Sequence, residues 1–153
     1  MSEVNVGTCS VAEIFDDAES AALFAGYESE CGNPLLGAAA PDRKAYEGLE
    51  ALGVGQAFCA RVDGKLCGLS FLLMAPTPHY NRFATVESLV ADPVARFTGI
   101  GKRLMDAVEN HARSAECVTI LYSAKAKSQL AKLLTLQADV YSLTSHVFAK
   151  RLR

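Results

Sequence analysis

The 153-residue sequence lacks the features that mark three large classes of protein. No apolar run approaches the roughly 18 residues that a membrane-spanning helix requires, and the first residues are polar rather than a hydrophobic leader. The formal net charge is -2, so the basic surplus that is typical of a general nucleic-acid binder is absent. These absences predict a protein that binds neither membranes nor nucleic acid.

Cysteine patterns for zinc or disulfide frameworks are missing as well. The 5 cysteines are an odd number and include no C-x-x-C pair, which argues against a disulfide framework and a zinc-ligand cluster. Cys59 and Cys67 lie in apolar segments, where a reduced cysteine acts as a small hydrophobic residue. We therefore expect a reduced, cytoplasmic protein without a bound metal.

No repeat, linker or low-complexity segment divides the chain. Its length suits a single domain over residues 1–153, and 50% hydrophobic with 21% charged residues is ordinary for a folded protein. Acidic residues crowd the first 30 positions and basic residues the last third. This split would suit an anionic ligand bound by the C-terminal part, although solvated helix faces explain any one charge equally well.

Two helices are predicted in the first third of the chain. Apolar residues recur at helical spacing through residues 11–31. Ser10, with Glu13 three residues later, can form a capping box at the start of this helix. A second helical segment is expected over residues 41–52.

The pattern then changes to strands. Residues 56–62 and 65–74 are strand-like and are joined by Asp63-Gly64, a dipeptide typical of two-residue hairpin turns. The mixed order of elements with a late βαβ unit predicts an α/β fold with a mixed, largely antiparallel sheet flanked by helices on both faces. The other expected elements are a strand at 83–90, a helix from about 100 to 115, a strand at 118–122, a helix at 128–136, a strand at 141–150 and one more strand at 5–9.

The turn after the 83–90 strand carries the clearest chemical signal, and it reads "ADPVARFTGIGKRL". A phosphate-binding P-loop would need a glycine where Arg96 stands, and a dinucleotide fingerprint would need one where Leu104 stands, so both motifs fail. The pattern that fits is R-x-x-G-x-G at Arg96, Gly99 and Gly101. A helix start without side chains in the way offers its N–H groups to an anion, which predicts a phosphate-binding site. The alternative interpretation is an ordinary glycine-containing turn that binds no ligand.

The stretch "ESLVADPVARFTGIGKRLMDAVENHA" resembles the central motif of the GNAT superfamily of acyltransferases. The order of elements from residue 10 to residue 153 agrees more loosely with the same family. The resemblance implies an N-acetyltransferase that moves an acetyl group from acetyl-CoA directly to a primary amine. It implies that the pantetheine arm binds the backbone of Leu89, Val90 and Ala91, and that the pyrophosphate binds the turn formed by Arg96, Phe97, Thr98, Gly99, Ile100, Gly101, Lys102 and Arg103.

The resemblance also implies a general base and a proton donor. Glu87 is the best base candidate, because it lies mid-strand, on the face expected for Leu89, where burial would raise its pKa; a structural glutamate is an equal alternative. The donor is less clear, because Leu134 stands where many family members carry tyrosine. Tyr122 and Tyr80 are substitute candidates, although a structural role is favoured for each.

The acceptor amine stays open, from small amines and antibiotics to amino acids, peptide termini and lysine side chains. Glu28, His79 and Tyr80 are candidate acceptor-binding residues, because they lie in segments that set specificity in the family. His111 is interpreted as a packed histidine on the apolar face of its helix. The missing tyrosine favours a rival of another class, a non-catalytic acyl-CoA-binding sensor or interaction module. Whether the chain forms a homodimer is also open.

Overall fold

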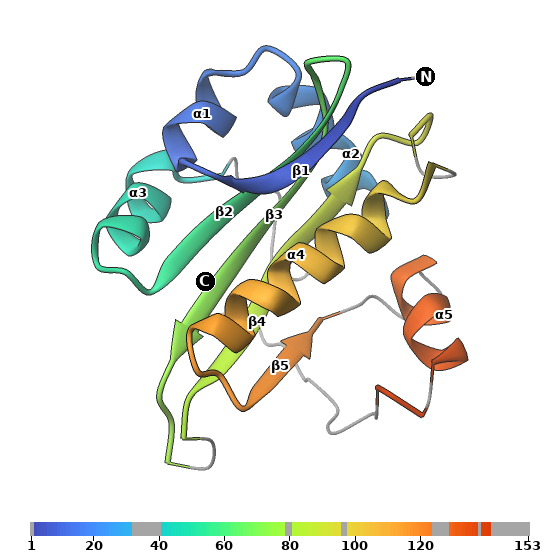
Figure 1. The fold of residues 1–153 in the computed structure, drawn as a ribbon. Helices are drawn as coiled ribbons and strands as arrows, with labels where there is room; N and C mark the ends of the chain where they lie inside the picture. Colours follow the sequence, from blue (N-terminus) through green and yellow to red (C-terminus); the bar gives the residue numbers. More distant parts are fainter. Residues whose placement is uncertain are drawn as a thin grey trace.

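A five-stranded sheet forms the centre of the computed structural model, which describes residues 2–31, 41–78, 81–95, 98–123, 129–137 and 139–141 (Figure 1). The strand order is β1-β2-β3-β4-β5. The first four strands pair antiparallel with their neighbours, and β5 pairs parallel with β4. The strands are β1 (Val4–Cys9), β2 (Gly55–Val62), β3 (Lys65–Ala75), β4 (Phe83–Ala91) and β5 (Thr119–Tyr122).

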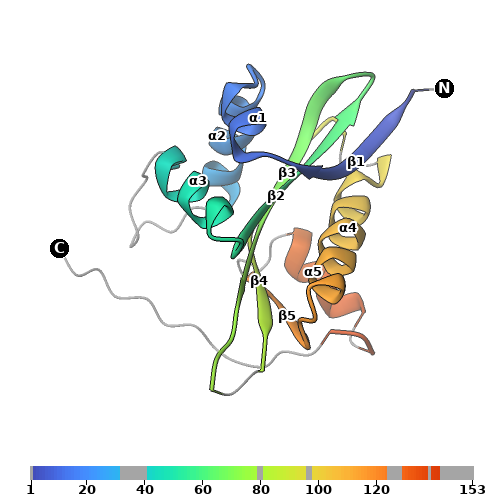
Figure 2. The same cartoon turned by 60° about the vertical axis from the view of Figure 1, so that its left-hand side comes forward.

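Helices cover both faces of this sheet, as Figure 2 shows from the side. The helix α4 (Ile100–Ser114) crosses one face. The other face carries α1 (Val11–Asp16), α2 (Ser20–Cys31) and α3 (Arg43–Ala51), while α5 (Gln129–Leu136) follows β5. The predicted mixed, largely antiparallel sheet with helices on both faces is confirmed.

The sheet separates two hydrophobic cores. The core under α4 includes Phe58, Leu72, Val86, Leu104 and Val108. The core under α1, α2 and α3 includes Val11, Ile14, Leu69, Phe71 and Val90. Because neighbouring residues of β3 alternate between the cores, its nearly continuous apolar sequence is a strand buried on both faces.

The single helix predicted over residues 11–31 is wrong, since the chain breaks between α1 and α2. Asp17 has extended backbone and its Oδ1 accepts a hydrogen bond from the Glu19 amide at 3.0 Å. The Ser20 hydroxyl donates to the Asp17 carbonyl oxygen at 2.7 Å. Short polar side chains that bind nearby backbone in this way compete with helical hydrogen bonds. The capping box at Ser10 and Glu13 is confirmed, with both of its hydrogen bonds present.

The hairpin prediction is confirmed, because Asp63 and Gly64 both adopt the positive φ values, 50° and 82°, that such a turn requires. The expected strand at 5–9 is present as β1. Of the strand expected at 141–150, all but Tyr141 lies outside the described residues. No helix in the described part of the chain is long and apolar enough to cross a membrane.

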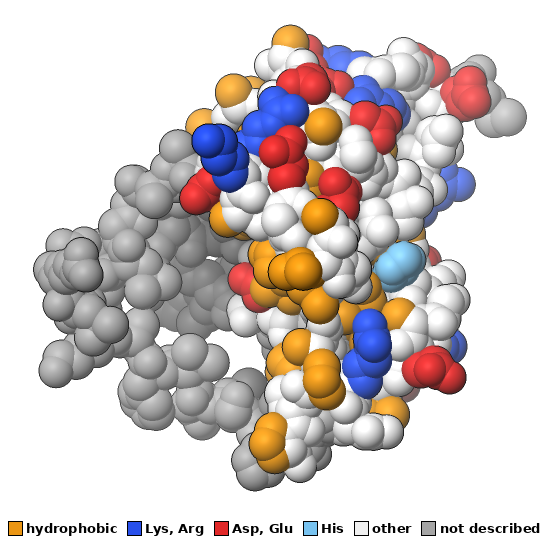
Figure 3. Space-filling view, turned by 90° about the vertical axis from the view of Figure 1, so that its left-hand side faces the viewer, with side chains coloured by type: hydrophobic (Ala, Val, Ile, Leu, Met, Phe, Trp, Pro, Cys, Tyr) orange, Lys and Arg blue, Asp and Glu red, His pale blue; other side chains and the backbone are white. Residues whose placement is uncertain are grey.

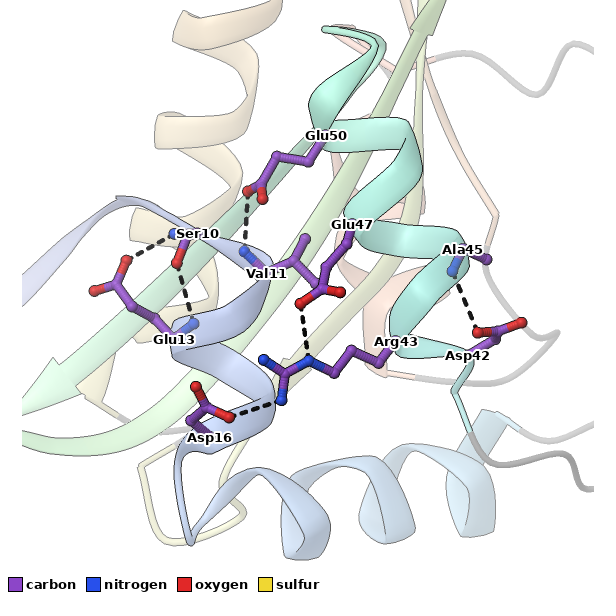
Figure 4. Close-up of polar contacts among 9 residues, drawn as sticks. All are labelled: Ser10, Val11, Glu13, Asp16, Asp42, Arg43, Ala45, Glu47 and Glu50. Atoms are coloured by element: carbon purple, nitrogen blue, oxygen red, sulfur yellow. Dashed lines mark hydrogen bonds and ion pairs between the residues drawn. The ribbon is translucent and has the colours of Figure 1, made fainter.

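Polar contacts tie α1 to α3 (Figure 4). The Val11 amide donates to Glu50 Oε1 at 2.9 Å, which satisfies an orphan N–H of the first turn of α1. Arg43 bridges the two helices, with Nη1 2.7 Å from Asp16 Oδ1 and Nε 2.8 Å from Glu47 Oε1. These ion pairs are largely exposed and contribute little energy singly, but they orient the two helices that cover this face of the sheet.

Candidate active site

The edge of β4 that faces β5 is only partly paired. Parallel pairing joins β4 residues 83–86 to β5 residues 119–122 and ends at Val86 and Tyr122. Within the described part of the chain, the second half of β4 therefore pairs with β3 alone. This half contains Leu89, Val90 and Ala91, so their backbone groups on the β5 side are placed to meet a ligand.

A β-bulge lies at the point where the two strands part. Phe71 of β3 pairs with Ser88 and Leu72 pairs with Val86, so Glu87 is the extra residue of β4. The bulge changes the alternation of side chains along the strand. Leu89 packs on the α4 core, whereas the Glu87 charge acts on Tyr46 of α3, on the opposite face. The expectation that Glu87 and Leu89 share a face is therefore wrong.

Ser70 of β3 fixes the backbone of this bulge. Its side chain is fully buried, and its hydroxyl donates to the Ser88 carbonyl oxygen at 2.6 Å. A bulge disrupts the ladder locally, and a buried carbonyl needs a donor wherever the ladder cannot supply one. The Ser70 hydroxyl thus helps hold the chain beside Glu87 in one conformation.

The Glu87 side chain reaches solvent, yet the protein around it removes enough water to raise the pKa of its carboxyl. The neighbouring phenol of Tyr46 has its pKa raised, first by burial and then by the negative charge of Glu87. A carboxylate with a raised pKa is a better proton acceptor than an ordinary surface glutamate. The predicted raised pKa of Glu87 agrees with this environment.

The N-terminus of α4 has no side-chain cap. Gly99 is the N-cap, has φ of 78°, and lacks a side chain that could cap the helix. The first intrahelical hydrogen bond runs from the Arg103 amide to the Gly99 carbonyl, so the amides of Ile100, Gly101 and Lys102 have no acceptor within α4. A Cβ added at Gly99 or Gly101 would meet none of the described atoms within 4 Å. Among the described residues, three amides without an acceptor in the helix therefore lie together at the positive end of the helix dipole, an arrangement that suits an anionic group such as a pyrophosphate.

Two basic side chains of this turn, those of Lys102 and Arg103, already have partners. Lys102 Nζ lies 2.8 Å and 2.9 Å from the two carboxylate oxygens of Asp106, one turn along α4. Arg103 Nη1 donates to the Val4 carbonyl oxygen of β1 at 3.3 Å. Both contacts are exposed, and either cation would have to exchange its partner to reach a phosphate. Thr98 closes the turn through a hydrogen bond from its hydroxyl to the Ala95 carbonyl oxygen at 2.5 Å.

Tyr122 lies on the α4 side of the sheet. Its hydroxyl donates to Glu109 Oε1 at 2.8 Å, and the Tyr141 hydroxyl donates to the same oxygen. Burial and the contact with Glu109 raise the pKa of Tyr122. Because Glu87 points to the other face, the structure does not bring these two candidates together. His111 is packed as expected, since its ring lies edge-on to that of Phe58 with the two ring centroids 5.5 Å apart.

Several predicted site residues lie outside the described part of the chain. These are His79, Tyr80, Arg96 and Phe97, while for Glu28 only its backbone position in α2 is described. The described residues hold no cluster of three or more side chains that could bind a metal. Sequence reasoning missed Tyr46 and Ser70, which share the neighbourhood of Glu87 only because the fold brings α3 and β3 beside β4.

Several solved structures with the same fold are acetyltransferases. A ribosomal-protein-alanine N-acetyltransferase from Brucella melitensis biovar Abortus 2308 has a TM-score of 0.69 at 22% identity, with 96% of this chain and 99% of that chain covered. An aminoglycoside acetyltransferase from an uncultured soil metagenomic sample, in complex with sisomicin, has a TM-score of 0.76 at 14% identity, with 98% and 97% covered. Glucosamine-6-phosphate N-acetyltransferase from Arabidopsis thaliana has a TM-score of 0.74 at 12% identity, with 99% of each chain covered.

The partly unpaired β4 and the uncapped start of α4 lie in a fold that this chain shares with these acetyltransferases. The sequence itself matches the acetyltransferase (GNAT) family over residues 11–133, while no curated protein matches it. The chain therefore belongs to the GNAT family, whose members generally use acetyl-CoA as donor.

Proposed function

We propose that the chain is an N-acetyltransferase that takes its acetyl group from acetyl-CoA and transfers it directly to a primary amine. One observation carries the proposal: the uncapped N-terminus of α4 follows, after the turn at residues 92–99, the half of β4 that β5 leaves unpaired. An anion site and a free strand edge, joined in this order, suit a ligand with a pyrophosphate and an amide-containing arm.

The residues of the turn and the strand would hold the cofactor. The amides of Ile100, Gly101 and Lys102 would bind the pyrophosphate, and the backbone of Leu89 to Ala91 would hydrogen-bond the pantetheine arm. Arg96 and Phe97 remain predicted members of the same turn. When bound, acetyl-CoA supplies the activated acetyl group.

Glu87 would act as the general base. An amine attacks a thioester only after it has lost its proton, and a carboxylate whose pKa is raised by burial can accept that proton near neutral pH. The bulge supports this role, because it directs Glu87 to the face covered by α1, α2 and α3, away from the α4 core. An acceptor held on that face would present its nitrogen to the carboxylate.

The proton donor for the leaving thiolate stays a prediction. Tyr122 remains a candidate, but its hydroxyl proton is donated to Glu109 and its burial on the α4 side favours a structural role. Tyr80 remains a prediction, as do His79 and Glu28 as acceptor-binding residues. Leu134 lies in α5, and its aliphatic side chain has no proton to donate.

Calorimetry and turnover together test the proposal. We expect acetyl-CoA, and neither ATP nor NAD, to bind the purified protein, and coenzyme A to be released when a panel of amines is added. Binding without release above background would instead support the rival, a non-catalytic acyl-CoA-binding module. The named neighbours act on unrelated amines, a ribosomal protein and glucosamine-6-phosphate among them, so the acceptor has to be sought in this chain's own residues.

A further inference from the structure

A small cavity of about 20 Å³ lies between the three N-terminal helices and the sheet. Its described walls are almost wholly apolar, and none of the described lining residues is acidic or basic. Figure 3 shows hydrophobic side chains gathered in the middle of the side of the molecule that carries α1 and α3, with mixed charges above them. The apolar character therefore belongs to the face on which the acceptor would bind.

Aromatic rings form one wall of this cavity in an unbroken series. The Phe24 and Phe15 ring centroids are 5.6 Å apart, and Phe15 lies 6.3 Å from Tyr46. The ring of Tyr46 lies edge-on to that of Phe71, with the two centroids 4.5 Å apart. Phe15, Phe24 and Tyr46 are only partly buried, so this wall is accessible at its outer end. Aromatic faces of this kind favour alkyl and aryl groups over hydrated polar ones.

The cavity adjoins the proposed base. Ser88, which follows Glu87 in the bulge, lines the cavity, and so does Tyr46, whose pKa responds to the Glu87 charge. A molecule that placed its nitrogen beside Glu87 would therefore place its next atoms against Tyr46 and Phe71. Since the cavity as it stands accepts about one methyl-sized group, a short chain would fill it and larger groups would extend along the partly exposed rings.

We infer that this cavity binds the apolar substituent of the acceptor, which makes the acceptor a monoamine with an alkyl or arylalkyl group next to its nitrogen. This inference rests on the proposed N-acetyltransferase function. A polycationic amino sugar fits poorly, because the described lining residues offer no carboxylate for additional positive charges. Apolar burial of the substituent would also bring the amine nitrogen within reach of Glu87, and removal of water from the nitrogen would disfavour its charged form.

A series of straight-chain amines, from methylamine to hexylamine, tests the inference with the full chain at saturating acetyl-CoA. We expect kcat/KM to rise about fourfold with the first methylene that enters the cavity, since a buried methylene contributes about that factor. Further methylenes, which would extend along the partly exposed rings, should each add a smaller gain. Replacing the terminal methyl by a hydroxyl should reverse the gain. Turnover that is flat along the series, or faster with glucosamine, would overturn the inference and leave the proposed function intact. No acetylation of any amine would overturn both.

A pair of variants separates the cavity from general packing. Phe15 and Leu49 pack against the same core, but only Phe15 lines the cavity. Phe15→Ala should move the preference toward longer chains, whereas Leu49→Ala should leave the order of preference unchanged. Equal shifts in the two variants, or none in Phe15→Ala, would contradict the assignment. Phe15→Leu, a smaller change in the same direction, serves if the alanine variant does not fold.

Discussion

Gly68 of β3 lies under the first turns of α4, and we predict that Gly68→Ala weakens both the fold and the cofactor site. A Cβ at this position would lie 2.9 Å from Leu104 Cδ1, 3.1 Å from the Val90 carbonyl oxygen and 3.2 Å from Ile100 Cγ2. Ile100 and Leu104 are fully buried, and the Val90 oxygen belongs to the β4 backbone. None of these atoms can move aside freely, so either α4 or β4 must shift.

The expected loss of stability follows from two opposing effects. Overpacking a filled core costs about 1–3 kcal/mol, while replacing glycine lowers the entropy of the unfolded chain and recovers roughly 0.5–1 kcal/mol. We therefore expect Gly68→Ala to lower the free energy of unfolding by about 1 kcal/mol, within a range of roughly 0–2.5 kcal/mol. Because binding must restore the original placement of α4 and β4, the acetyl-CoA dissociation constant should rise about fivefold, the factor that corresponds to roughly 1 kcal/mol.

Urea unfolding, with Gly48→Ala as the matched control, checks the prediction. Gly48 lies inside α3, and a Cβ there meets none of the described atoms within 4 Å, so this variant should gain about 0.5–1 kcal/mol of helix stability. The two glycine-to-alanine changes should thus have opposite signs. A Gly68→Ala protein as stable as the parent, with unchanged acetyl-CoA affinity, would refute the packing described for α4.

Three further predictions concern the site and its surroundings. Glu87→Gln should preserve acetyl-CoA affinity but lower kcat by about 100-fold or more. In the parent, the carboxyl of Glu87 must lose its proton at a raised pKa, so the acidic limb of the pH–rate profile should disappear in the variant. An unaltered profile would make Glu87 structural. Ser70→Ala should cost about 1–3 kcal/mol in thermal or urea unfolding, because the carbonyl at the bulge loses a buried donor, and an unchanged midpoint would show that the hydroxyl is dispensable. Iodoacetamide at pH 7.5 should label Cys59 before Cys67, as read by peptide mass spectrometry. A hydrogen bond from the Cys9 side chain lowers the pKa of Cys59, whereas burial raises the pKa of Cys67; the reverse order would contradict this.

The arrangement of elements could largely be predicted from the sequence, because local signals agreed with the fold. Asp63-Gly64 admits the positive φ values of a tight hairpin, and the Ser10 capping box marks the start of α1. The glycine turn before α4 could be recognised for the same reason, since Gly99 adopts a positive φ that glycine favours. The break after Asp16 was missed, because apolar periodicity continues across it while the Asp17 and Ser20 side chains bind the local backbone instead.

The candidate site was only partly predictable, because its geometry depends on contacts between distant segments. The bulge at Glu87 is invisible in a sequence whose alternation looks regular, and it reverses the face of every later side chain in β4. Tyr46 reaches Glu87 through the packing of α3 on the sheet. Tyr122 was placed correctly in a strand, but its partner Glu109 depends on how α4 crosses the sheet.

Titration of acetyl-CoA into the parent protein and Gly101→Val tests the central claim most directly. The parent should bind in the micromolar range, and the variant should lose binding, because its side chain would enter the open space above the bare amides of α4. Gly48→Ala, whose change lies in α3, should bind as the parent does. Absence of binding by a folded parent, or equal affinity in Gly101→Val, would contradict the assignment of this turn as the cofactor site.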